Sequence, residues 1–500
     1  MRILYVDIDS LRADHLGCYG YHRRTSPNID ALAAEGVRFD RLYGSDSPCL
    51  PSRSALIFGR FGINNGVVTH GGTAADPFPE GPPRHFQSRS ARTTWTRRMR
   101  TAGVRSTTIS TFGERHSASQ WYQGFNEVYN LGTMGFERAD QVDEVAQDWL
   151  RRNGASDDWF LHVNLWDPHT PYRTPDEYGD PFADEPLPSW LTEDVRAQLW
   201  ERPGPHSAQE MLGFTPLGAL GRPIELRRQP SQLSDSDEVR RMFDGYDTGV
   251  HYSDHYVGRL INTLADMGLL EETAVIVSAD HGEALGELGV CGDHHTADET
   301  VNRLPMIIRW PGIEGGRVDE GFRYQIDMAA TVLEMLGAKV PDDWDAVSFA
   351  DGLRSGAPDE GRGHVVVGHG AWTCQRAVRF ERYLCIRTYH DGYHGYPDVM
   401  LFDIEADPHE QQDLADKEPA IVDHALRLLE EWHVEAMRRS STGIDPMWTV
   451  LREGGPWHTR GHLRDYLTRL RDTGRGSWAD DLEAKHGAER ELQPPQWGAD

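Results

Sequence analysis

Lysine is almost missing from this chain of 500 residues. The 51 basic residues include only three lysines, Lys339, Lys417 and Lys485, and all three lie late in the chain. Any cationic side chain close in sequence to Cys49, the cysteine of the segment "SPCLPSR", must therefore be an arginine or a histidine.

Cysteine and long apolar runs are scarce as well. The five cysteines are odd in number and widely scattered: Cys18, Cys49, Cys291, Cys374 and Cys385. This spacing argues against a disulfide framework and shows no close pairs of the kind that bind metal in zinc fingers. No run approaches the roughly 20 apolar residues that span a bilayer, and the opening "MRILYVDID" lacks the features of a secretion signal. We therefore expect a cytoplasmic protein without a membrane segment.

Acidic residues outnumber basic ones by 79 to 51, which gives a net charge of -28 at pH 7. This charge disfavours nucleic acid and anionic membrane surfaces as partners, and long polyanionic substrates unless the site itself is locally basic. A hydrophobic content of 38% suffices for a sizeable core. Because the length exceeds that at which a single core stops growing, we expect one large domain with a smaller companion.

Apolar runs alternate with amphipathic helical segments over most of the first 340 residues. The strand-like runs lie at 2–9, 37–43, 104–110, 159–167, 273–280 and 304–310. The helical patterns between them include 26–36 and 138–152. This alternation predicts an α/β fold in which a large, mostly parallel sheet is sandwiched by helices.

Changes of composition predict the domain organisation. Residues 1–361 form the expected catalytic domain. Within it, 173–235 is rich in proline, glycine and acidic residues and is either an insertion that shapes the substrate entrance or a surface excursion. Short strands in series followed by a helix predict a smaller α+β domain with an antiparallel sheet at 362–440. The tail at 441–500 shows no regular spacing of hydrophobic residues, and its tryptophans suggest an oligomer contact.

Acidic residues and a histidine stand at the ends of two predicted strands. Asp7 and Asp9 close the first strand, and Asp280 and His281 follow the run "TAVIVS". If these strands are neighbours in a parallel sheet, their carboxyl ends converge and the side chains meet. Carboxylate oxygens with one imidazole suit a hard or borderline divalent cation, so we expect a metal site there.

The segment "PCLPSRSALIF" predicts a helix that begins near Pro51, a residue type favoured in the first turn. The amino end of a helix attracts anions, which places Cys49 and Arg53 where an oxyanion would bind. The forked guanidinium of Arg53 matches a tetrahedral oxyanion. The alternative is an ordinary helix start with a buried cysteine.

The sequence "CLPSR" at 49–53 resembles the Cys-x-Pro-Ser-Arg signature of type I sulfatases, in which a formylglycine-generating enzyme oxidises the cysteine to an aldehyde. The resemblance extends from residue 3 to about 430. It includes the stretches "DIDSLRADHLGCYGY", "TSPNIDALAAEGVRF", "LPMIIRWPG" and "LFDIEADPHEQQDLA". The "DHG" at 280–282 resembles the bacterial subgroup that includes choline sulfatases and phosphonate monoester hydrolases. This resemblance implies an alkaline-phosphatase-like fold.

By this resemblance, Asp9, Asp280, His281 and the modified residue 49 hold one divalent metal, and Asp7 is a further candidate ligand. Calcium is the ion that the family implies. The imidazole ligand makes manganese the alternative.

The resemblance also points to cationic groups around the metal. Where the family has a Lys-x-His segment, this chain has Glu114 in place of the lysine and keeps the histidine as His116. A second family lysine is absent, and His295 stands in that region beside His294. "NLWDPHTPY" places His169 where the family has a histidine that contacts the leaving group.

The implied reaction is hydrolysis of a sulfate ester to an alcohol and inorganic sulfate. The hydrated aldehyde at position 49 attacks sulfur while the metal and Arg53 withdraw charge. His169 or His295 protonates the leaving alcohol, and His116 removes the proton that lets the sulfated hydrate break down.

Two other functions stay open. A phosphonate monoester or phosphodiester hydrolase could use the same site, and the missing lysines allow a binding protein without catalysis. The acidic charge and the expected cytoplasmic location favour a small sulfate ester as substrate. His70 and His294 are further candidates of unknown role.

Overall fold

The strand at the amino end of the chain, β1 (Arg2–Ile8), lies inside the main sheet of the computed structural model, which describes residues 1–210, 226–357 and 361–495. The strand order is β13-β2-β12-β8-β1-β7-β5-β6. The other bounds are β13 (Arg317–Asp319), β2 (Val37–Phe39), β12 (Met306–Arg309), β8 (Thr273–Ser278), β7 (Trp159–Leu165), β5 (Arg105–Ile109) and β6 (Glu127–Tyr129). β1 pairs in parallel with both β7 and β8, and β12 runs antiparallel to β8. The prediction of a mixed, mostly parallel sheet is confirmed.

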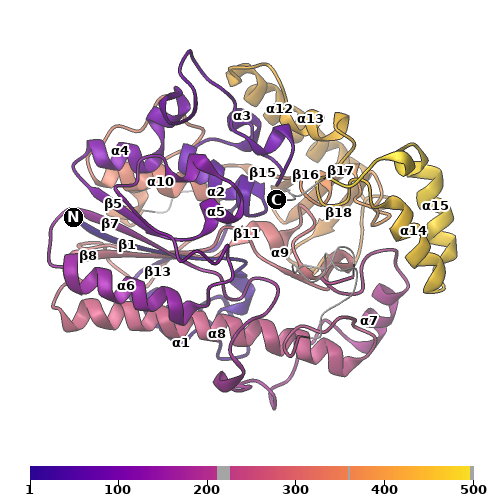
Figure 1. Ribbon diagram of the computed structural model, residues 1–500, viewed down its shortest axis with the longest axis horizontal. Helices are drawn as coiled ribbons and strands as arrows, with labels where there is room; N and C mark the ends of the chain where they lie inside the picture. The colour runs from indigo at the N-terminus through magenta and orange to yellow at the C-terminus, as the bar shows by residue number, and fades with distance from the viewer. Residues whose placement is uncertain (211–225, 358–360, 496–500) are drawn as a thin grey trace.

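Two layers of helices cover this sheet, as Figure 1 shows. One face carries α1 (Pro27–Glu35), α6 (Ala139–Asn153) and α8 (Ser236–Asp266); the other carries α2 (Cys49–Phe58), α4 (Trp95–Thr101) and α10 (Gln325–Met335). Successive side chains of a strand point to opposite faces. Leu4 and Val6 of β1 therefore pack in the layer of α6 and α8, whereas Tyr5 packs in the layer of α4 and α10. Asp7 shares the face of Tyr5 and so points toward α2.

The smaller sheet has the strand order β18-β17-β16-β15-β4. Its carboxyl-terminal strands are β15 (His364–His369), β16 (Cys374–Phe380), β17 (Tyr383–His390) and β18 (Val399–Asp403), which pair antiparallel. Helix α12 (Pro419–Arg439) packs on this sheet through Ala425 and Leu429. The predicted antiparallel sheet with one helix is confirmed.

This sheet also contains a strand that the sequence did not reveal. β4 (Asp46–Ser47) pairs in parallel with β15, so that Gly368 lies opposite Asp46 and His369 opposite Ser47. The hydroxyl group of Ser47 is 3.0 Å from Nδ1 of His369. Since β4 ends one residue before Pro48, the smaller sheet fixes the chain that leads directly into Cys49.

Short elements complete the described part of the chain. The predicted strand at 37–43 is split between β2 and β3, which belong to different sheets. The remaining strands and helices are β3 (Leu42–Tyr43), β9 (Ala284–Leu285), β10 (Cys291–Asp293), β11 (Arg303–Leu304), β14 (Arg323–Tyr324), α3 (Gly62–Asn65), α5 (Phe112–Arg115), α7 (Glu193–Trp200), α9 (Glu299–Asn302) and α11 (Ala350–Ser355). No helix in the described ranges is both long and apolar enough to cross a membrane.

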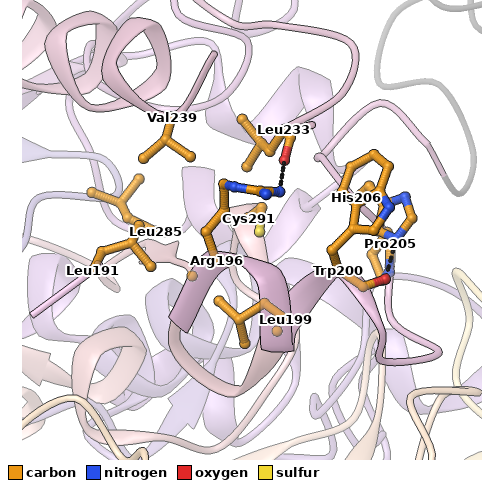
Figure 2. Close-up of a pocket in the computed structure, with 12 residues that line it drawn as sticks. Leu191, Arg196, Leu199, Trp200, Pro205, His206, Leu233, Val239, Leu285 and Cys291 are labelled. Carbon is orange, nitrogen blue, oxygen red and sulfur yellow. Dashed lines mark hydrogen bonds between the residues drawn. The ribbon is translucent and has the colours of Figure 1, made fainter. Parts of the chain in front are cut away.

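The predicted insertion at 173–235 is mostly irregular around α7, and its residues 211–225 lie outside the described residues. Its described part encloses a small cavity, shown in Figure 2, together with Leu285 and Cys291. The guanidinium of Arg196 donates to the carbonyl oxygen of Leu233 there. The cavity measures about 20 Å³, room for roughly one water molecule. A substrate must therefore bind elsewhere.

The tail folds into three helices, α13 (Pro446–Arg452), α14 (Leu463–Asp472) and α15 (Gly476–His486), which lie at the edge of the molecule in Figure 1. Tyr466 and Leu470 of α14 pack with Tyr393 of the smaller domain. The indole of Trp478 donates to the carbonyl oxygen of Glu201. In the described part of the tail, Tyr466 and Leu470 are thus buried on the same chain, whereas Trp448 is 56% exposed. An oligomer remains a prediction.

One ionic cluster fastens the end of α15 to β17, and it should make tail docking depend on pH. His486 lies 2.8 Å from Asp391 on one side and 2.8 Å from Glu489 on the other. Despite burial, these carboxylates raise the pKa of His486 from 6.5 to about 9. A raised pKa in the folded state contributes stability that is complete below pH 6.5 and is lost as pH rises through about 9.

We therefore predict that amide hydrogen exchange in α14 and α15 becomes faster between pH 6.5 and 9 than the intrinsic rate explains. His486→Gln should remove this dependence, because glutamine does not titrate there. The mechanism is wrong if the variant retains the wild-type pH profile.

Candidate active site

The carboxyl ends of β1 and β8 meet because these two strands are parallel neighbours. Asp9 lies just past β1 and Asp280 just past β8, while α2 brings Cys49 to the same place. The side chains of Asp9, Cys49, Asp280 and His281 are all buried, and one ligand atom from each lies within 4.8 Å of the others. The structure therefore brings together four of the residues that the sequence predicted as metal ligands.

His281 is oriented by its own backbone. Its Nδ1 donates to the carbonyl oxygen of Gly282 at 2.8 Å, which leaves Nε2 with a free lone pair. That Nε2 lies 3.0 Å from the sulfur atom of Cys49 and 3.6 Å from a carboxylate oxygen of Asp9. An imidazole held in this tautomer is prepared to bind a cation.

Arg53 lies one helical turn after Cys49 and is fully buried. Its Nε donates to Asp280 at 3.0 Å, its Nη2 to Asp9 at 3.1 Å, and its Nη1 to Asp7. Three buried carboxylates thus face a single positive charge, and the set has a net charge of minus two. A divalent cation fits this donor set in both charge and chemistry.

Asp7 lies on the far side of this arrangement. It contacts Arg53 and Nε2 of His162, the latter at 3.2 Å, and it is not a member of the group that surrounds Cys49. Its Oδ1 is buried without a hydrogen-bond partner among the described residues. The geometry makes Asp7 a partner of Arg53, and its role as a metal ligand stays a prediction.

The thiol of Cys49 is poorly suited to act as a nucleophile itself. Burial, and then the negative charges of Asp9 and Asp280, raise its pKa well above the usual value. A neutral, buried thiol is inert because the thiolate is the reactive form. The unmodified thiol is therefore a poor nucleophile at this position.

Two histidines border the group from the side of β7. Nε2 of His169 lies 3.9 Å from Asp9, and its Nδ1 is bound to the carbonyl oxygen of Thr170. The ring of His294 is 4.2 Å from that of His281 and 5.5 Å from that of His169. Figure 1 shows the region between the two domains where α2, α5 and β15 converge.

Two further histidines approach Cys49 from the opposite side. His70 and His116 have ring centroids 4.8 Å apart and form a second close group with Cys49. Nε2 of His116 is buried without a hydrogen-bond partner in the described part of the chain. Burial and the charge of Arg115 lower the pKa of His116, which favours its neutral ring.

Comparison with known proteins identifies the family. The family model described as Sulfatase matches residues 2–338, more than half of the chain. The chain belongs to the sulfatase family. A second model, described as N-sulphoglucosamine sulphohydrolase, C-terminal, matches residues 286–433. This sulfatase is accordingly an enzyme of the sulfuric ester hydrolase class, not a binding protein without catalysis.

The choline-sulfatase of Rhizobium meliloti is 24% identical over 477 residues, which cover 86% of this chain and 88% of the relative. The N-acetylglucosamine-6-O-sulfatase of Bacteroides thetaiotaomicron is 23% identical and covers 83% of this chain and 82% of its own length. A phosphonate monoester hydrolase from Silicibacter pomeroyi has a TM-score of 0.66 at 22% identity, covering 89% of this chain and 96% of its own. The alkaline-phosphatase-like fold is confirmed.

His295 is outside the close groups around Cys49 in the described residues of this sulfatase, and its catalytic role stays a prediction. Its ring stacks on Trp372 at 4.0 Å, and Trp372 stacks on His458 of the tail at 4.4 Å. His458 in turn lies 2.9 Å from Nδ1 of His70. His295 thus belongs to a row of rings that ends at His70 and His116, instead of to the group at the metal site.

Sequence reasoning missed His458 and Arg115. His458 lies 388 residues from His70 in a tail without a recognisable motif, so no local pattern could have identified it. Arg115 stands between Glu114 and His116, and the scarcity of lysine could have drawn attention to it. Glu114, which stands where the family resemblance leads us to expect a lysine, is exposed. Arg115 instead acts on the site, because burial and then its charge lower the pKa of His169.

Arg53→Met tests whether the guanidinium holds the buried carboxylates together. Removing it leaves three unpaired charges in the interior, and breaking such a buried pair costs about 3 to 5 kcal/mol. We predict this loss in urea unfolding with EDTA present, and partial recovery when calcium or manganese is added. Arg427→Met, at an exposed position on α12, is the matched control. Equal stability of Arg53→Met and wild type in EDTA would contradict the assignment.

Proposed function

We propose that this sulfatase hydrolyses a sulfate ester with a formylglycine hydrate made from Cys49 and with one divalent cation held by Asp9, Asp280 and His281. The observation that carries the proposal is the meeting of these side chains at the start of α2, within 4.8 Å of one another. The products are an alcohol and inorganic sulfate.

The cation supplies Lewis acidity, which draws charge from the sulfate and favours ionisation of a hydroxyl group at position 49. Calcium is the ion that the family resemblance implies, and manganese is the alternative because one ligand is an imidazole. Residue 49, as the modified side chain, completes the donor set. Asp7 accepts a hydrogen bond from Arg53 and so helps to hold the guanidinium that contacts Asp9 and Asp280.

Arg53 has a positioning role in this proposal. The sequence placed it on the sulfate, yet each of its three nitrogen atoms donates to a carboxylate. A guanidinium engaged in this way fixes the spacing of Asp9 and Asp280 and offsets their mutual repulsion. The sulfate must then find other cationic groups.

The reaction proceeds in two stages. One hydroxyl oxygen of the hydrate at residue 49 attacks sulfur, and the bond between sulfur and the ester oxygen breaks. The proton that the attacking hydroxyl group loses passes to Nε2 of His169, which lies 3.9 Å from Asp9, and His169 gives that proton to the departing ester oxygen. We choose His169 over His295 because His295 is stacked on Trp372 and lies 3.1 Å from His394.

In the second stage His116 takes the proton from the remaining hydroxyl group of residue 49. The carbon-oxygen bond to sulfate breaks, sulfate leaves with that electron pair, and the aldehyde is restored and hydrated again by water. His116 is suited to this step because its Nε2 is unpartnered and it lies in one close group with Cys49. An ordinary serine or cysteine has no second hydroxyl group and could not release sulfate in this way.

A phosphonate monoester hydrolase is the second candidate. The structural similarity to a phosphonate monoester hydrolase supports it, and the same nucleophile and cation would serve a tetrahedral phosphorus centre. The cytoplasmic location, maturation by a formylglycine-generating enzyme and assembly into a homo-oligomer stay predictions from the sequence.

The first test addresses the nucleophile. Mass spectrometry of the peptide that contains Cys49, from protein coexpressed with a formylglycine-generating enzyme, should show the aldehyde in place of the thiol. Cys49→Ala should lower kcat by about 10³-fold or more, because no second group can replace the nucleophile. An intact thiol in a fully active sample would sink the proposal.

The second test separates the two reactions. Aryl sulfate and aryl phosphonate monoesters with the same leaving group should be hydrolysed with kcat/KM values that differ by at least about tenfold, or about 1.4 kcal/mol, in favour of sulfate. Cys49→Ala provides the background rate for both. A higher kcat/KM for the phosphonate ester than for the sulfate ester would establish the phosphonate hydrolase instead.

A further inference from the structure

Two arginines beside the active site lack carboxylate partners. Arg115 ends α5, and Arg173 lies in the loop that follows β7. Within the described ranges neither forms an ion pair with a carboxylate. Arg115 donates to the carbonyl oxygen of Met134 at 3.3 Å, and Nη1 of Arg173 is buried without any hydrogen-bond partner.

Acidic residues outnumber basic ones by 79 to 51, so carboxylate partners are plentiful. Buried arginines have them: Arg12 binds Glu287, Arg23 binds Asp247 and Arg376 binds Asp445. Arg115 and Arg173 are partly buried, and Nη1 of Arg173 is itself shielded from solvent. A buried donor without a partner is costly. It implies a partner that the chain itself does not supply.

The two guanidinium groups both lie against one aromatic ring. The Cζ atom of Arg115 is 5.8 Å from the centre of the Phe136 ring, and that of Arg173 is 5.0 Å from it. Phe136 is 37% exposed, so this pair borders solvent. Arg115 also lies 5.1 Å from the ring of Trp166, which is 5.7 Å from the ring of His169. The pair is thus next to the proposed acid for the leaving group.

The surroundings of Arg173 disfavour the charged form of its side chain. Burial lowers its pKa to about 10, the nearby charge of Arg115 acts in the same direction, and Asp167 opposes them. The group is still charged at neutral pH. Asp167 and Glu137 act on Arg173 without an ion pair to it among the described residues, so the repulsion between the two guanidinium groups is relieved when an anion binds beside them.

The charges around the metal site indicate how many anionic groups the substrate must bring to neutralise Arg115 and Arg173. Asp7, Asp9 and Asp280 carry three negative charges, and Arg53 with a divalent cation carries three positive ones. A sulfate monoester brings one negative charge, whereas Arg115 and Arg173 offer two positive ones. Asp167 and Glu137 also act on Arg173, but neither forms an ion pair with it in the described part of the chain, so one guanidinium has no directly bound anion unless the substrate carries a second anionic group. Forked guanidinium donors match carboxylate and sulfate groups.

We propose that Arg115 and Arg173 bind a second anionic group, a carboxylate or a second sulfate, on the alcohol portion of the substrate. This inference rests on the proposed sulfatase function and narrows its substrate class to sulfate esters with two negative charges. A cationic ester such as choline sulfate is a poor substrate, because both guanidinium groups repel its ammonium group.

The test uses a matched pair of substrates, 3-carboxyphenyl sulfate and its neutral analogue 3-carbamoylphenyl sulfate. Calorimetric binding to metal-loaded Cys49→Ala measures affinity without turnover, and sulfate release by the aldehyde-containing enzyme measures kcat/KM. We expect the carboxylate ester to bind about tenfold or more tightly and to react correspondingly faster, as a charged hydrogen-bonded pair predicts. Choline sulfate should bind more weakly than either.

Variants locate the preference. In Arg173→Met and Arg115→Met the ratio of the two affinities should fall toward one, and Arg173→Lys should keep part of it because the charge remains. Arg427→Met should keep the whole ratio. If the ratio is one in the wild type, or survives in both methionine variants, the arginine pair has no such role.

Two further outcomes separate this inference from the function on which it rests. A binding preference for the carboxylate without hydrolysis of either sulfate ester would overturn the sulfatase mechanism and retain the arginine pair. Equally tight binding of 3-carbamoylphenyl phosphate, whose two charges lie on the reacting group, would assign both arginines to that group and overturn the inference.

Discussion

The active site depends on one buried guanidinium that faces three carboxylates. Asp7, Asp9 and Asp280 come from two strands and would repel one another in a dry interior. Arg53 donates to all three, and because it lies one turn after Cys49 it ties α2 to both strands. The sheet, the helix start and the charge of the metal site are therefore set by the same interaction.

Local patterns were enough to predict six strands of the main sheet, its helices α1, α2 and α6, and the meeting of Asp9, Asp280 and His281. Strand ends and a helix start can be read from hydrophobic period and motif alone, and adjacent parallel strands bring their ends together. The partners of Arg53 could not be read this way, because they depend on which face of β1 points toward α2. Nor could His458, whose place beside His70 is set by tail packing across 388 residues.

The chain combines an acidic surface with a basic rim at its active site. Its net charge of -28 disfavours anionic ligands at long range. Arg115 and Arg173 reverse this preference at short range, where they border Phe136 without carboxylate partners. The lysines that the family uses near its sulfate are absent, and arginines and histidines occupy the surroundings of Cys49 instead. The net negative charge thus acts on ligands at long range, and the two arginines act on them at short range.

The pairing of β4 with β15 has a consequence for biosynthesis. Ser47 and His369 are 322 residues apart, so a ribosome must add those 322 residues before the loop preceding Cys49 has its partner. Closing so long a loop is slow. The cysteine segment therefore stays without its β15 partner while those residues are made, and the folded protein then encloses it, with only 1% of Cys49 exposed.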